Sequence, residues 1–94
     1  MSHALFCVND NGNVGIGTVS PSKKFHVAGQ TSNVTLRIDT TGADPNLTFT
    51  TLGQQDWGVG VDFSDSGKLK FDASGFVGAA TKMTIDNAGN VGIG

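Results

Sequence analysis

The sequence lacks several residue types that a self-sufficient globular domain usually contains. Glu and Tyr are absent, Leu occurs five times, and only 37% of the 94 residues are apolar. A chain of this length is close to the size at which a single hydrophobic core becomes marginal. With few apolar residues available, the composition predicts a segment that is stabilised by association with other chains. Strong helix formers are also scarce, which disfavours a helical fold.

Charge and hydropathy exclude two further classes of protein. Six basic residues are scattered along a chain of net charge −2, so no basic stripe exists for nucleic acid. No apolar run approaches the roughly 20 residues of a membrane span, and the N-terminus lacks a signal-peptide pattern. We expect no nucleic-acid partner and no membrane insertion, and we interpret residues 1–3 as a cloning remnant. Cys7 is the single cysteine, and we expect it to pack as a small hydrophobe.

The residues that are plentiful favour strands and turns. Thr occurs ten times, Asn and Ser seven times each, and Gly 14 times. The pattern Asp/Asn/Ser-x-x-Gly, which suits bulged hairpins, begins at residues 9, 39, 64, 72 and 86. The fold class predicted is all-β, with short strands and bulged hairpins, and one helical turn at 20–24. The expected strands are 4–9, 12–17, 24–28, 33–39, 46–51, 57–63, 68–72, 81–86 and 89–94.

A repeat gives the strongest internal signal. Residues 12–17 (GNVGIG) recur unchanged at 89–94, an offset of 77, and the flanking residues 6–9 and 83–86 match in character. Such a sequence is typical of one period of a longer array. It predicts three parts: a repeat element at 1–29, a β-rich shaft domain at 30–80, and a second copy of the element at 81–94.

The repeated element has the pattern of a strand that meets other copies of itself. Because side chains alternate across a strand, its branched residues point to one side and its glycines to the other. Glycine within a strand suits the close approach of another backbone. The predicted oligomer interface is therefore Val14, Gly15, Ile16, Gly17, Val91, Gly92, Ile93 and Gly94.

Residues 10–18 (DNGNVGIGT) and 20–27 (SPSKKFHV) carry a family resemblance. They resemble the GNVGIGT-x-SP-x-x-KLHV element of phage long tail fibres and related bacterial surface fibres, with Val19 and Phe25 as mild departures. The resemblance implies an elongated, parallel, intertwined homotrimer that contacts neighbouring fibre segments and supports host attachment. It implies a location in a virion tail fibre or, alternatively, on a bacterial cell surface. The resemblance does not extend to residues 30–80.

No residue pattern indicates catalysis, a metal site or a cofactor, so we predict that the chain is not an enzyme. The glycines of 12–17 run in the wrong order for a dinucleotide loop. The acidic turns lack the terminal Glu and the ligand spacing of a calcium loop. His26 has no partner at ligand spacing, and no serine lies in a nucleophile elbow. Asp62 and Asp65 are paired carboxylates only by proximity.

Trp57 supports an alternative function as the centre of a carbohydrate-binding module. It follows Gln55 and Asp56, and an aromatic ring beside polar groups can stack on the apolar face of a sugar. The partner would then be a host surface glycan, contacted by these three residues. The other interpretation is that Trp57 covers the end of the core.

Overall fold

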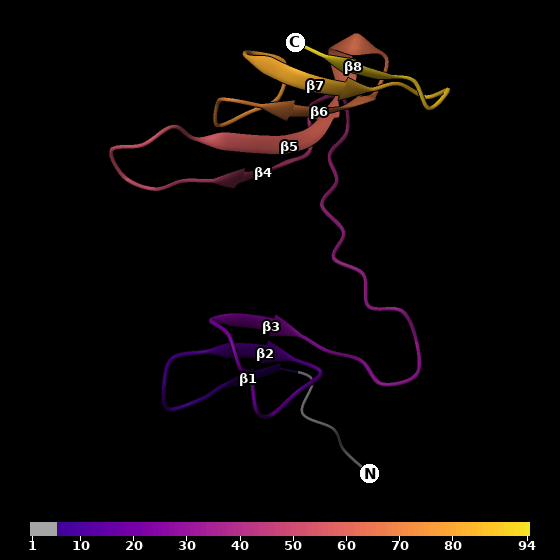
Figure 1. Cartoon of the computed structure of the whole chain (residues 1–94). Helices are drawn as coiled ribbons and strands as arrows, with labels where there is room; N and C mark the ends of the chain where they lie inside the picture. The colour runs from indigo at the N-terminus through magenta and orange to yellow at the C-terminus, as the bar shows by residue number, and fades with distance from the viewer. Residues whose placement is uncertain (1–5) are drawn as a thin grey trace. The chain divides into compact units, whose positions relative to one another are not determined.

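The computed structural model describes residues 6–94 and divides into two units, one ending at Leu36 and the other spanning Arg37–Gly94. Each unit contains one β-sheet (Figure 1). The predicted all-β fold class is confirmed, because the described residues form eight strands and one short 3-10 helix, η1 (Phe63–Asp65). Among these residues, no helix is long and apolar enough to cross a membrane.

The first unit is a three-stranded sheet in the order β1-β2-β3. Its strands are β1 (Phe6–Val8), β2 (Val14–Ile16) and β3 (Phe25–Val27). β1 and β2 form an antiparallel hairpin, whereas β3 runs parallel to β2. A parallel neighbour requires a crossover connection. Here residues 17–24 make that crossover, and Pro21 within it is buried.

The second unit is a five-stranded antiparallel sheet in sequence order. Its strands are β4 (Asn46–Phe49), β5 (Trp57–Asp62), β6 (Lys68–Asp72), β7 (Thr81–Ile85) and β8 (Val91–Ile93). An irregularity between Phe71 and Asp72 places Thr81 opposite Asp72. Such a bulge changes which face the following side chains occupy.

The two copies of the repeat form the same hairpin. Phe6 pairs with Ile16 in the first copy, and Met83 pairs with Ile93 in the second, with the offset of 77 kept throughout the register. In each turn, the N–H of the first residue (Asn9 or Asp86) donates to the carbonyl of the last residue (Asn13 or Asn90) at 3.0 Å. The turn glycines Gly12 and Gly89 both have positive φ, at 77° and 90°. The two identical hexapeptides therefore lie in hairpins of the same register.

Several predictions of local structure need correction. Residues 33–39 form no strand, and the chain from 28 to 45 is irregular and largely exposed. Although Leu36 and Ile38 alternate with polar residues, no strand in the described chain pairs with them. Residues 20–24 form bends instead of a helical turn, and helical geometry occurs at η1. The expected strand 4–9 begins partly in residues 1–5, which lie outside the described chain, as does the interpretation of residues 1–3.

Candidate functional site

One whole face of the five-stranded sheet is apolar. The strand register places the same-face residues side by side: Leu47, Phe49, Trp57, Val59, Val61, Leu69, Phe71, Met83, Ile85, Val91 and Ile93. None of these side chains is buried, and Ile93 is 79% exposed. In this unit, as far as the structure describes it, the single buried apolar side chain is Val77, which lies outside this face. Antiparallel sheets normally pack their apolar face into a core and leave the polar face in water. This unit has the reverse arrangement.

The three-stranded sheet repeats that arrangement. Its same-face residues, again all apolar, are Phe6, Val8, Val14, Ile16, Phe25 and Val27. Phe6 and Phe25 are 67% and 53% exposed, and none of the six is buried. We call these two surfaces the apolar faces. Monomeric soluble proteins rarely leave contiguous apolar patches of more than a few hundred Å² uncovered. The apolar faces are therefore the strongest candidate for a functional surface.

In the first unit, the chain covers the opposite face, which consists of Cys7, Gly15 and His26. Gly15 is buried, and a Cβ added there would lie 2.6 Å from the Thr18 carbonyl oxygen. The Ser22 N–H donates to His26 Nδ1 at 3.1 Å, and the Cys7 thiol points to the Val19 carbonyl at 3.8 Å. The crossover thus closes over Gly15, where it leaves no room for a side chain.

In the second unit, residues 73–80 cover Gly58, and Pro45 and Asn46 lie over Gly60 on the same face. A Cβ on Gly58 would lie 3.0 Å from the Ser74 carbonyl oxygen, so the glycine permits the loop to approach. The Thr48 hydroxyl donates to the Gly75 carbonyl at 2.6 Å. Both glycines are buried, although neither contributes a side chain to a core.

An ion cluster lies on the same covered face. Lys70, which is 8% exposed, donates to Asp62 Oδ2 at 2.8 Å and lies 2.7 Å from Asp65 Oδ2. Lys68 adds a second cation to Asp65 at 3.0 Å. Ser64 donates both its N–H and its hydroxyl to Asp62 Oδ1. Buried charges require such pairing and hydrogen bonding.

The ion cluster shifts the pKa values of its members. Hydrogen bonds from Lys70 and then Ser64 hold the pKa of Asp62 below its usual 3.8. Hydrogen bonds from Lys70 and then Lys68 lower the pKa of Asp65 in the same way. The two carboxylates raise the pKa of Lys70 above 10.5. A pair of carboxylates that acts in glycan cleavage needs one raised pKa. The lowered pKa values of Asp62 and Asp65 therefore fit two anions that pair with Lys70 in a structural ion cluster.

Asp72 is a second buried carboxylate, with 0% exposure. It accepts hydrogen bonds from the Ala80 N–H at 2.9 Å and from the Thr81 hydroxyl at 3.1 Å. The bulge in β6 brings Thr81 to this position. Asp72 thus fixes the end of the covering loop where the loop enters β7.

The predicted interface residues divide between the two kinds of face. Val14 and Ile16 lie on the apolar face of the first unit, and Val91 and Ile93 lie on that of the second. Gly15 and Gly92 point to the opposite faces, and Gly17 and Gly94 follow the strands with positive φ. The predicted facing of these residues is therefore present, but Gly15 accommodates the chain's own crossover. The sequence interpretation missed the extent of the apolar faces, which the alternation in β4 to β7 could have indicated.

The three residues proposed to contact a glycan lie in different surroundings. Trp57 is 46% exposed on the apolar face and pairs across the sheet with Phe49. The Gln55 side chain donates to the Ala73 carbonyl at 2.6 Å, which holds the covering loop. Asp56 lies near that loop as well, since a Cβ on Gly75 would be 3.5 Å from its Oδ2. Within the described residues, no three His, Cys, Asp or Glu side chains form a group that could hold a metal ion.

A comparison with protein-family models and with curated proteins found no match. The resemblance to tail-fibre elements consequently rests on residues 10–27 and on the repeat alone.

Proposed function

We propose that this chain is a non-catalytic structural segment of a homotrimeric, phage-type tail fibre that supports host attachment. The observation that carries the proposal is the pair of apolar faces, neither of which packs against a layer of its own unit. Burying a Val, Leu, Ile, Phe or Met side chain contributes about 1.5–3 kcal/mol. A chain with this many exposed apolar side chains gains most of its stability when copies meet.

The arrangement of the faces suits a closed assembly of identical chains. Each sheet is a single layer, already covered on its polar or small-residue side, so only one side remains for partners. Three such layers can enclose a triangular core with their apolar faces inward. The number three comes from the family resemblance, and the apolar faces supply the driving force. In the assembly, the loops on the outer side would face water.

The absolute mass in solution tests this proposal. The chain has a mass of 9.6 kDa, so light scattering or native mass spectrometry should give about 29 kDa for a homotrimer. An unboiled sample on an SDS gel should also migrate above the boiled one. A stable 9.6 kDa species at micromolar concentration would contradict the proposal. A two-chain mass would keep the apolar association and reject the trimer.

A further inference from the structure

The two copies of the repeat hairpin differ in what covers them. In the first copy, Gly15 lies beneath the crossover, where an added Cβ would lie 2.6 Å from the Thr18 carbonyl oxygen and 3.3 Å from the Pro21 Cβ. The Asn13 side chain donates to the Pro21 carbonyl at 3.3 Å. At the equivalent position of the second copy, a Cβ on Gly92 would have no atom within 4 Å.

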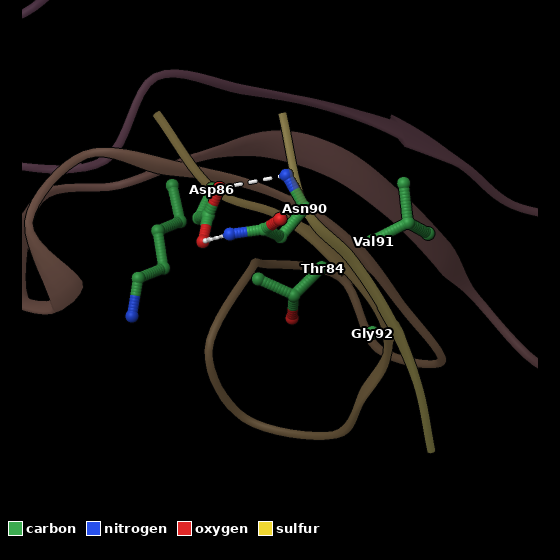
Figure 2. A pocket seen from close by; sticks show the side chains of 6 residues that line it. Thr84, Asp86, Asn90, Val91 and Gly92 are labelled. Atoms are coloured by element: carbon green, nitrogen blue, oxygen red, sulfur yellow. Dashed lines mark hydrogen bonds between the residues drawn. The ribbon is translucent and has the colours of Figure 1, made fainter. Parts of the chain in front are cut away.

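A hollow of about 260 Å³ occupies this uncovered place on the second hairpin. It is lined by Lys68, Thr84, Asp86, Asn90, Val91 and Gly92 (Figure 2). Five of these six correspond, at the offset of 77, to residues of the first hairpin, and three of those counterparts, Cys7, Asn13 and Gly15, lie against the crossover. The hollow thus lies where residues 18–21 lie over the hairpin of the first unit.

The polar groups of the hollow are arranged differently from their counterparts. Asn13 reaches out to the crossover, whereas the Asn90 side chain turns back and donates to Asp86 Oδ2 at 3.0 Å (Figure 2). Asp86 also accepts the Asn90 N–H at 2.8 Å, and these two bonds, the backbone one first, lower the pKa of Asp86. To donate to a carbonyl that enters the hollow, the Asn90 amide would use its second N–H or release Asp86 Oδ2.

The edge of the sheet beside the hollow is also free. In the first unit, β3 pairs parallel with β2, and the Val14 N–H donates to the Lys24 carbonyl at 2.7 Å. In the described part of the second unit, β8 pairs with β7 alone, so Val91 has no corresponding strand partner. An unpaired edge strand presents a row of donors and acceptors that can accept another strand.

We propose that the small-residue face and free edge of the β7–β8 hairpin form a docking site for a segment like residues 18–28. The occupant is a Thr-x-Ser-Pro turn followed by a strand of the type Phe-x-Val, as in residues 18–28. The turn fills the hollow above Gly92, and the strand pairs parallel with β8. The added Phe and Val then continue the apolar face, as Phe25 and Val27 do beside β2. This site is independent of the number of chains in the assembly.

Extending the complete chain after Gly94 tests the proposal. One variant carries a copy of residues 18–28, and its matched control carries the same residues in scrambled order. Amide hydrogen exchange at Val91, measured by NMR, should slow by about tenfold or more only with the correct order. Gly92→Ala should remove that protection, because a Cβ would meet the docked threonine as it would at Gly15.

The substitution also supplies a control in the 94-residue chain. There, Gly92→Ala should leave exchange at Val91 and Thr84 unchanged, since the position is open. Equal exchange rates for Val91 in the correct and scrambled extensions would overturn the proposal. Protection that survives Gly92→Ala would also overturn it, because the turn would then lie elsewhere.

Discussion

Both sheets have one exposed apolar face and one face that the chain covers, but only the second sheet carries a cluster of charged groups on its covered face. In the first unit, the crossover lies over Cys7, Gly15 and His26. In the second, hydrogen bonds from Thr48 and Gln55 hold residues 73–80, and the charged cluster is centred on Lys70. We therefore expect both units to associate through their apolar faces, and we expect the stability of only the second unit to depend strongly on charge.

One matched pair of substitutions tests whether the chains associate through the apolar face or through the covering loop. Phe49 lies on the apolar face and is 58% exposed, and Phe76 lies in the covering loop and is 60% exposed. Phe49→Asp should lower the mass in solution to that of one chain, because it places a charge in the interface of every copy. Phe76→Asp should leave the mass unchanged. Equal behaviour of the two variants in light scattering would contradict a role for the apolar face.

The contribution of the ion cluster to the stability of the second unit can be tested at Lys70. Lys70→Met removes the cation that Asp62 and Asp65 share, and leaves the buried Asp62 carboxylate without a cation while Asp65 keeps Lys68. We expect a large loss of stability in the second unit, seen as a fall in Tm by Trp57 fluorescence. Lys82→Met, at an exposed position of β7, is the matched control and should have little effect. Similar Tm values for both variants would show that the ion cluster is dispensable.

The same contrast predicts pH dependence confined to the second unit. The depressed pKa values of Asp62 and Asp65 stabilise the fold above 3.8, and this contribution is lost as the pH falls through the folded values. The raised pKa of Lys70 stabilises the fold below 10.5 and is lost as the pH rises through its folded value. The stability of the second unit, followed by Trp57 fluorescence, should therefore fall at both extremes of pH. In Lys70→Met, the fall in stability at alkaline pH should be absent, because the titrating amine is gone.

A smaller effect distinguishes the covered hairpin from the open one. Gly15→Ala places a Cβ against the Thr18 carbonyl, so we expect a cost of about 1–3 kcal/mol in the free energy of unfolding. Gly92→Ala meets no atom and should change it by less than about 0.5 kcal/mol. Urea denaturation of both variants measures the difference. Equal costs would mean that the crossover does not lie over Gly15.

The smallest expected effect concerns sugars. Trp57 pairs with Phe49 on the apolar face, so a structural role predicts that a glycan array shows no binding above background. Trp57→Ala should then lower stability without changing that array. Binding that Trp57→Ala abolishes, in a variant that keeps its fold by NMR, would instead support the carbohydrate-binding module.

Local patterns predicted most of the strands because their signals lie within a few residues. The alternation of Val59 and Val61 with glycine identified β5, and the identical hexapeptides predicted two equal hairpins. Residues 33–39 show a similar alternation but form no strand, because strand formation also requires a neighbour to pair with. Sequence spacing alone does not reveal such a neighbour.

The covered faces could not be predicted from the sequence for the same physical reason. Asp62 and Lys70 are eight residues apart, and the loop that encloses them returns from beyond β6. Charged residues in a strand normally predict the face that is exposed to solvent. The ion cluster and the glycines beneath the loop become evident only when the register and the returning loop are known.

The emission of Trp57 tests most directly whether copies of the chain cover the apolar face. It is the single tryptophan and is 46% exposed in the isolated chain. A homotrimer built on the apolar faces predicts blue-shifted emission that acrylamide quenches weakly at micromolar concentration. It also predicts a shift to red, readily quenched emission in the single-chain Phe49→Asp variant. Red, fully quenched emission from the folded wild-type chain, unchanged with concentration, would contradict association through this face.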